Sequence, residues 1–277
     1  MSGRMRTAVL QQIRDGAFEP VAKRVRAMLD GVTVVDTTGS ALIWEPRRIV
    51  PSYAVPEQDI AGEVLPDPGP PTADDGFPTL HPGIPFSVHS APGERVLVRA
   101  PGGASAAGGF RLSDPELQGL VVLDFAGFDA WMEEDELVVS HPRDPFHRID
   151  ILRSSRHVRV ELEGELLAET RRPKLLFETS LPMRVYIPRE DVRTELLVPT
   201  GTRTRCAYKG EASYWSVEGA GDAGTDLVWS YEAPVREAAE VTGLMAAFNE
   251  RVDLEIDGRR AERPNTPWSR NWDGQML

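Results

Sequence analysis

The densest group of chemically active side chains in this 277-residue chain lies between Arg205 and Trp215. Within six residues the segment places a thiol, a phenol, an ammonium and a carboxylate, those of Cys206, Tyr208, Lys209 and Glu211. Lys209 beside Glu211 could form a proton-transfer pair, with Tyr208 as a second acid. The segment is therefore the first candidate for acid–base chemistry.

Lys209 could also act as a nucleophile. A lysine desolvated by aromatic rings loses its proton more readily and can form a Schiff base with a carbonyl. Aromatic walls with a few polar groups are also typical of ligand pockets. The rings expected to surround Lys209 and to line such a pocket are those of Tyr214, Trp215, Trp229 and Tyr231.

The same segment has a structural interpretation. Lys209-Gly210 could form a hairpin turn, with Lys209 and Glu211 in a surface salt bridge and the aromatic rings in the core. Surface ion pairs are common and individually weak. Cys206, a candidate ligand contact, is more simply a buried inert thiol than a nucleophile, because the sequence assigns it no histidine partner.

Four further residues are candidates. Glu178 and Arg189 follow predicted strands and could face the same cavity as Lys209, or pair with each other. His147 and Arg148 end the run His141-Pro-Arg-Asp-Pro-Phe-His-Arg. Two histidines with an aspartate between them could ligate a metal, but the two prolines exclude helical ligand spacing. We expect a structured loop that lines a cleft between two domains, with no metal and no cofactor.

The chain repeats itself at a spacing of roughly 130 residues, which is the size of a domain. Corresponding positions in the two copies are Gly31 and Gly164, Trp44 and Phe177, Glu45 and Glu178, and Asp59 and Asp191. The stretch of the first copy that corresponds to the Lys209 segment, residues 89–95, lacks the cysteine, tyrosine and lysine. This asymmetry indicates that the second copy holds any active site.

Short apolar runs separated by turn residues predict a mainly β protein. In each copy a hairpin turns at Gly31 or Gly164, and a later strand ends at Pro56 or Pro188. Few segments have helical periodicity. We predict two tandem, homologous small β domains, each a sandwich or an open barrel.

The predicted domain organisation has three parts. A short helix occupies residues 1–20, a first, diverged β domain residues 21–150, and a second β domain residues 151–277. The first domain carries a Pro/Gly-rich insertion at 64–87, which we expect to form a long surface loop or a lid.

Composition excludes several partners. The net charge is −12 and the sequence pI is about 5.0. Affinity for nucleic acid depends largely on lysine and arginine that neutralise phosphates, so we expect neither nucleic-acid nor membrane partners. Apolar runs fall short of the ~18 residues that span a bilayer. The N-terminus has no secretory pattern, and one cysteine excludes a disulfide framework. We therefore expect a cytoplasmic protein.

Four segments resemble a known family. They are Leu-Phe-Glu-Thr-Ser-Leu-Pro at 176–182, Tyr-Ile-Pro-Arg-Glu-Asp-Val at 186–192, Thr-x-Cys-x-Tyr-Lys-Gly-x-Ala-x-Tyr-Trp at 204–215, and Val-Trp-Ser-Tyr at 228–231. They are similar to the domain-of-unknown-function family 427, sometimes labelled nucleotidyltransferase-like, in its tandem two-domain form. The resemblance is good over about 156–270 and weaker over 21–150.

The resemblance implies a compact β fold akin to β-tent domains, whose relatives bind small ligands in aromatic cages. It implies no defined activity. Nucleotidyl transfer in particular calls for features that the sequence does not show, namely a Gly-rich phosphate loop and metal-binding aspartates beside it.

Three function hypotheses follow. The favoured one is a small-molecule-binding protein whose pocket lies in the second domain, with Lys209 and Glu178 setting its polarity. The alternative is an enzyme acting on a small carbonyl or anionic substrate, with Lys209 as nucleophile or acid, Glu211 or Glu178 as base and Tyr208 as proton donor. The third is a structural or interaction protein without a pocket.

Overall fold

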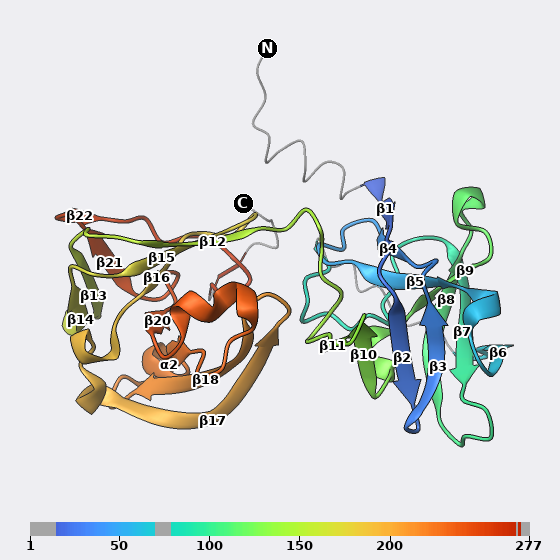
Figure 1. Cartoon of the computed structure of the whole chain (residues 1–277). Coiled ribbons are helices and arrows are strands. Elements are labelled where there is room, and N and C mark those ends of the chain that lie inside the picture. The colour runs from blue at the N-terminus through green and yellow to red at the C-terminus, as the bar shows by residue number, and fades with distance from the viewer. Residues whose placement is uncertain (1–14, 70–78, 270, 273–277) are drawn as a thin grey trace, which may run out of the picture. The chain divides into compact units, whose positions relative to one another are not determined.

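The computed structural model describes residues 15–69, 79–269 and 271–272 (Figure 1). The chain divides into two compact units, Met1–Asp144 and Pro145–Leu277. Each unit is built from antiparallel sheets, with short helical turns between the strands. The prediction of a mainly β protein is confirmed. None of the described helices is long and apolar enough to cross a membrane.

The first unit contains a seven-stranded sheet, in the order β1-β4-β5-β9-β8-β7-β6, and a four-stranded sheet, β11-β10-β2-β3. One core cluster joins buried side chains from both sheets. Its strands are β1 (Ala17–Pro20), β2 (Val25–Leu29), β3 (Val32–Thr37), β4 (Ala41–Trp44), β5 (Ser52–Pro56), β6 (Glu63–Pro66), β7 (Gly93–Arg99), β8 (Ala106–Leu112), β9 (Leu120–Leu123), β10 (Ala130–Glu133) and β11 (Glu136–Leu137). Its 3-10 turns are η1 (Glu57–Asp59), η2 (Pro115–Leu117) and η3 (Phe125–Gly127).

The second unit contains three sheets, β12-β15-β16, β14-β13-β21-β22 and β17-β18-β19-β20. Its strands are β12 (Ile149–Arg153), β13 (Val158–Leu162), β14 (Glu165–Thr170), β15 (Lys174–Glu178), β16 (Arg184–Tyr186), β17 (Leu197–Cys206), β18 (Gly210–Val217), β19 (Val228–Ser230), β20 (Met245–Ala247), β21 (Asp253–Ile256) and β22 (Arg259–Arg260). Its helical turns are η4 (Arg189–Asp191), η5 (Thr194–Leu196), α2 (Gly221–Gly224) and η6 (Arg236–Val241).

The predicted hairpins form as expected in both units. β2 and β13 each alternate buried and half-buried residues, which is the period-two pattern of a strand with one face on the core. The turns at Asp30-Gly31 and Glu163-Gly164 have positive φ at both residues. Such a turn matches the twist of the strands that it joins, and it favours glycine at its second position.

The two units share further details of this region. β2–β3 and β13–β14 each carry a register shift after their third residue pair. Thr37 donates its hydroxyl to Asp59 at 2.6 Å, and Thr170 donates to Asp191 at 2.7 Å. The corresponding residues of the repeat therefore occupy corresponding structural positions in this region.

Two predictions need correction. Residues 17–20, predicted as the end of the N-terminal helix, form β1, whose backbone pairs with β4. Residues 1–14 of that prediction lie outside the described residues. The 64–87 insertion is not simply a surface loop. It begins within β6, which pairs with β7, and Leu80 is fully buried. Residues 70–78 lie outside the described residues.

The boundary between the units lies six residues before the position that the sequence analysis chose. Residues 145–150 belong to the second unit. The reason is that β12 pairs with β15 along its whole length. The segment that carries His147 is thereby placed beside the end of β15.

Candidate functional site

Glu178 and Lys209 form a nearly buried ion pair in the second unit. Glu178 is the last residue of β15, and Lys209 lies in the turn between β17 and β18. The Lys209 Nζ atom lies 2.5 Å from Oε2 of Glu178, and the two side chains are only 11% and 5% exposed. The carboxylate thus reaches the lysine from a strand 31 residues earlier in the chain.

The turn that holds Lys209 explains why a glycine follows it. Gly210 has φ +97, a conformation that L side chains rarely adopt. A Cβ atom there would lie 3.2 Å from the backbone nitrogen of Val235, which donates to the carbonyl of Lys209. Gly210 therefore lets the segment around Val235 approach closely and fix the backbone of Lys209.

His147 completes the arrangement. Its Nε2 atom lies 3.1 Å from Oε1 of Glu178, and its ring stacks on Tyr208 with centroids 4.1 Å apart and planes at 19°. Its side chain is 18% exposed. We call His147, Glu178, Tyr208 and Lys209 the Glu178 cluster; three separate segments of the second unit contribute to it.

The charges of the cluster reinforce one another. Burial by itself would raise the pKa of Glu178, but the charge of Lys209 and the hydrogen bond from His147 outweigh it and lower that pKa to about 2. Burial would likewise lower the pKa of Lys209, but the Glu178 carboxylate outweighs it and raises that pKa. The pair is therefore ionised, and Lys209 keeps its proton.

The expectation of a Lys209 pKa lowered by aromatic rings is wrong for this geometry. The sequence argument considered the rings near Lys209 along the chain, whereas the decisive neighbour is a carboxylate from a distant strand. Tyr186 is a neighbour that the sequence argument did not single out. The pKa of the Tyr186 phenol is raised to about 12, mainly because the side chain is buried. The positive charge of Lys209 acts in the opposite direction.

Glu211 does not join Lys209. It is exposed and pairs with Arg205 across the β17–β18 ladder, with Nε and Oε2 3.0 Å apart. The turn at Lys209-Gly210 interrupts the strand alternation that would have placed Lys209 and Glu211 side by side. The expected proton-transfer pair is therefore replaced by Lys209 with Glu178.

The four aromatic residues do not surround one cavity. Tyr214, Trp229 and Tyr231 belong to one buried cluster, which also contains Tyr186. Trp215 packs against the other core cluster of the unit, because successive residues of β18 point to opposite faces. The Trp229 indole donates to the Tyr186 hydroxyl at 3.3 Å, so these rings build the core beneath the Glu178 cluster.

The remaining candidates lie at the surface or at the margin of the cluster. The Arg189 guanidinium stacks over Trp215 at 5.2 Å and pairs with Glu232 at 3.6 Å, rather than with Glu178. Arg148 is exposed and pairs with Asp150. Cys206 is half-buried at the end of β17, and its electrostatic effect on Lys209 is smaller than that of Glu178.

The first unit has a related buried carboxylate. Glu45, which follows β4, is 1% exposed and lies 2.8 Å from Nδ1 of His89. It also accepts the backbone N–H of Ser90 at 2.8 Å. The position of the carboxylate is thus repeated, but its partner is a histidine rather than a lysine. In the sequence, the correspondence of Glu45 with Glu178 favours a structural role for this carboxylate position.

The described residues contain no cluster of metal-ligating side chains. Over residues 15–69, 79–269 and 271–272, His, Cys, Asp and Glu side chains form no group of three or more that could hold a metal ion.

Comparison with known proteins identifies the second unit. The family model NTP_transf_9, described as a domain of unknown function (DUF427), matches residues 150–258. The second unit is a DUF427 domain. Three members of the Glu178 cluster, Glu178, Tyr208 and Lys209, lie within the match. His147 lies just before it. No curated protein matches the chain.

Proposed function

We propose that the DUF427 domain binds a small molecule at the exposed side of the Glu178 cluster, with His147 as its polar contact. The observation that carries the proposal is the position of His147. Glu178 and Lys209 are nearly buried, whereas the side chain of His147 is partly exposed and its ring stacks on Tyr208.

The geometry suits a proton acceptor. With the Nε2 proton directed at Glu178, the Nδ1 atom of His147 carries the lone pair. Lys209 keeps Glu178 ionised, and the ionised carboxylate orients the ring through its hydrogen bond with Nε2. A fitting ligand has an N–H or O–H group that hydrogen-bonds to Nδ1.

Burial of these charges supports a role beyond packing. Replacing a buried ion pair with apolar residues is often neutral or stabilising. A pair that is retained and placed beneath an accessible imidazole therefore favours a functional site. The opposing observation is the buried Glu45 of the first unit, which contacts backbone as well as His89 and so favours a structural role for this carboxylate position.

A second candidate function is proton-transfer catalysis on the bound molecule. A histidine oriented by a carboxylate is a common general base. This hypothesis assigns the base to His147 and the positioning role to Glu178. Schiff-base chemistry at Lys209 is less well supported, because the ammonium group is held by Glu178 and its pKa is raised.

A thermal-shift screen of neutral and anionic metabolites tests the proposal. A ligand at a hundred times its dissociation constant stabilises the native state by about 2.7 kcal/mol. We expect at least one shift that His147→Ala abolishes and His157→Ala preserves. His157 is a matched control because it also pairs with a carboxylate in this unit, Glu169 at 2.6 Å.

If no compound shifts the wild type, or both variants respond equally to every compound that does, the binding proposal is wrong and a structural role replaces it. Any confirmed ligand is then incubated with the wild type and assayed for turnover by mass spectrometry. Turnover that His147→Ala abolishes would favour the enzyme over the binding protein.

We further propose that the two units arose by duplication. The shared hairpin turns, register shifts and Thr–Asp hydrogen bonds support a common origin. A crystal structure in which residues 25–60 and 158–192 superimpose poorly would contradict it.

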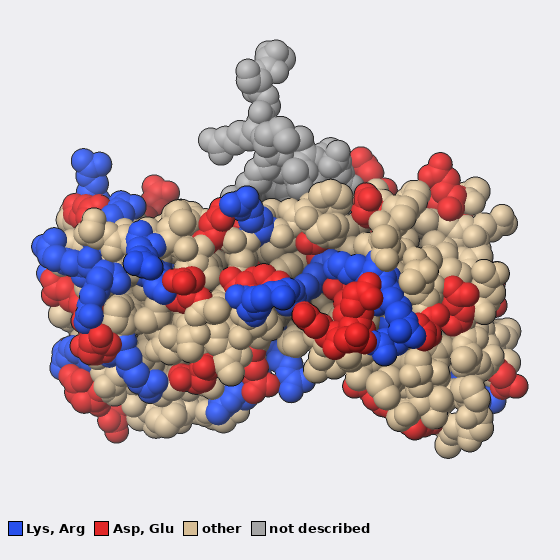
Figure 2. Space-filling view, viewed as in Figure 1, with Lys and Arg blue, Asp and Glu red and all other residues tan. Residues whose placement is uncertain are grey.

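We also propose a cytoplasmic location, without nucleic-acid or membrane partners. The net charge of −12 supports this, and on the face shown in Figure 2 basic side chains lie beside acidic ones. Cell fractionation and a gel-shift assay at low salt are the corresponding tests.

A further inference from the structure

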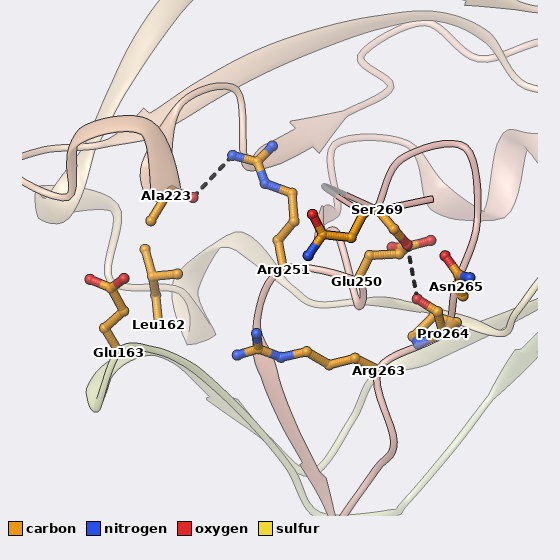
Figure 3. Close-up of a pocket in the computed structure, with 10 residues that line it drawn as sticks. Leu162, Glu163, Ala223, Glu250, Arg251, Arg263, Pro264, Asn265 and Ser269 are labelled. Carbon is orange, nitrogen blue, oxygen red and sulfur yellow. Dashed lines mark hydrogen bonds between the residues drawn. The ribbon is translucent and has the colours of Figure 1, made fainter. Parts of the chain in front are cut away.

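The second unit contains a cavity of about 300 Å³ that the Glu178 cluster does not line (Figure 3). Its walls come from the β13–β14 turn, from α2 and from the segments around Glu250 and Pro264. This volume is at the lower end of the range for ligand pockets, roughly 300 to 1,000 Å³. The cavity therefore has room for a small metabolite.

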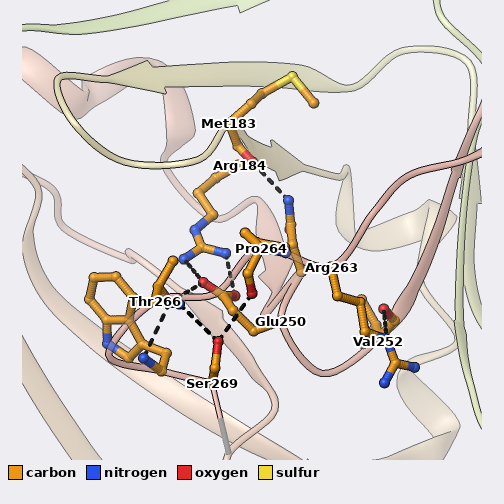
Figure 4. A network of polar contacts seen from close by, with 10 residues as sticks. Met183, Arg184, Glu250, Val252, Arg263, Pro264, Thr266 and Ser269 are labelled. Atoms are coloured by element: carbon orange, nitrogen blue, oxygen red, sulfur yellow. Dashed lines mark hydrogen bonds and ion pairs between the residues drawn. The ribbon is translucent and has the colours of Figure 1, made fainter. Parts of the chain in front are cut away.

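A buried ion pair holds one wall of the cavity in place. The Arg184 guanidinium donates to both carboxylate oxygens of Glu250 at 2.7 Å, and Thr266 donates its hydroxyl to the same carboxylate at 2.6 Å (Figure 4). The backbone N–H of Thr266 donates to the Ser269 hydroxyl at 2.9 Å. These bonds fix the segment 264–269, so a ligand meets a wall that is already formed, which lowers the entropic cost of binding.

The charged groups of the wall balance one another. The wall contains two glutamates and two arginines. Glu250 carries the ion pair just described, and Arg263 pairs with Asp253 at 2.6 Å. Arg251 donates to three backbone carbonyls in the segment 222–225. A charged ligand would have to compete with these partners, so the balance favours a neutral ligand.

Three other side chains of the wall are open to hydrogen bonding, those of Glu163, Asn265 and Asn271. None of the three makes a hydrogen bond or an ion pair within the part of the chain that the structure describes. Figure 3 shows Glu163 and Asn265 on opposite sides of the cavity. An amide both donates and accepts, and a carboxylate accepts. Hydroxyl groups, which do both, match this set, whereas an anion would face the carboxylate of Glu163.

We propose that this cavity binds a small neutral polyol, a sugar or a sugar alcohol. Its hydroxyl groups donate to Glu163 and exchange hydrogen bonds with the amides of Asn265 and Asn271, while Ala223 and Pro264 offer apolar surface to its C–H groups. A few polar groups beside apolar surface are typical of ligand sites. The site uses none of the residues of the Glu178 cluster, so it stands independently of the function proposed above.

Isothermal titration calorimetry of the full chain tests the site. The neutral probes are glucose, ribose and sorbitol, and the charged probes are glucose 6-phosphate and glucosamine. We expect saturable binding of at least one neutral probe, and weaker binding of both charged probes. Asn265→Ala should weaken the neutral probe about two- to tenfold, which corresponds to one lost hydrogen bond. Asn265→Trp, which fills the cavity, should abolish binding.

A pair of variants in the β13–β14 hairpin gives the matched control. Glu163→Gln removes a charged acceptor from the cavity wall and should weaken the neutral probe. Glu165→Gln should leave binding unchanged, because Glu165 pairs with Arg193 and does not line the cavity. His147→Ala should also leave it unchanged, which separates this site from the Glu178 cluster.

Three results would overturn the proposal: no saturable binding of any neutral probe, tighter binding of a charged probe than of every neutral one, or wild-type binding in the folded Asn265 variants. Asn265→Ala keeps the test decisive even if Asn265→Trp does not fold. The Asn265 amide makes no hydrogen bond within the described residues, so its removal should leave the melting temperature unchanged.

Discussion

Glu178 lies between Lys209 and His147, with one carboxylate oxygen 2.5 Å from Nζ of the lysine and the other 3.1 Å from Nε2 of the histidine. Each partner is 31 residues away along the chain, in opposite directions. One carboxylate therefore joins the loop before β12 to the turn before β18. The ion pair has consequences for stability, for pH dependence and for reactivity.

Glu178→Gln should destabilise the second unit strongly. Removing one partner of a buried ion pair leaves an uncompensated charge, at a cost of about 3 to 5 kcal/mol. Urea unfolding measures the change in the free energy of unfolding. Glu211→Gln is the matched control, since it breaks the exposed pair with Arg205 and should cost less than about 1 kcal/mol. Equal losses in the two variants would show that Glu178 is not a buried partner.

The stability of the protein should fall in acid because of Glu178. Its pKa is lowered from 4.5 to about 2 in the folded state. A lowered pKa stabilises the folded state fully above pH 4.5, and this contribution is lost as the pH falls toward 2. Glu178→Gln removes the contribution at every pH. The difference in unfolding free energy between wild type and variant should therefore shrink as the pH drops, and a constant difference would contradict the assignment.

Lys209 should resist imine formation. Its raised pKa keeps the amine protonated at neutral pH, and its ammonium group donates a hydrogen bond to Glu178. Incubation with a panel of small aldehydes and ketones and borohydride, followed by peptide mass mapping, should leave Lys209 unmodified. A Lys209 adduct formed as readily as those of the exposed Lys23 would support the Schiff-base enzyme instead.

Gly210→Ala should destabilise the turn that carries Lys209. The residue has φ +97, and an added Cβ would meet the Val235 nitrogen at 3.2 Å. An alanine in such a conformation costs more than about 1 kcal/mol. Gly201→Ala is the control, because Gly201 lies in the adjacent strand without a positive φ and a Cβ there meets nothing within 4 Å. Thermal melting of both variants gives the comparison.

The strands were predictable from the sequence, whereas the site was predictable only in part. Alternation in Val158–Leu162 and the turn at Gly164 are local signals, and both formed as expected. The sequence analysis named every member of the Glu178 cluster. It placed Glu178 near Lys209 only as one alternative and paired Lys209 first with Glu211, because neighbours in sequence are visible and contacts between distant strands are not.

The aromatic residues show a second reason for the difference. Tyr214 and Trp215 are adjacent in a strand, so the period of two already places them on opposite faces. Grouping them in one pocket gave more weight to residue type than to position. His89 was missed as the partner of Glu45 because nothing local links the two residues, which are separated by 44 positions.

The pKa values of two histidines in the first unit should be shifted in opposite directions from the ordinary histidine value. Burial by itself would lower the pKa of His89, but Asp124 and Glu45 outweigh it and raise the pKa above 6.5. Burial lowers the pKa of His81 below 6.5. Imidazole NMR signals, assigned with His89→Asn and His81→Asn, give both midpoints. Because a raised histidine pKa stabilises the folded state below pH 6.5, His89→Asn should cost more stability in mild acid than above the folded-state pKa of His89. Midpoints in the reverse order would show that, in solution, Asp124 and Glu45 do not raise the pKa of His89.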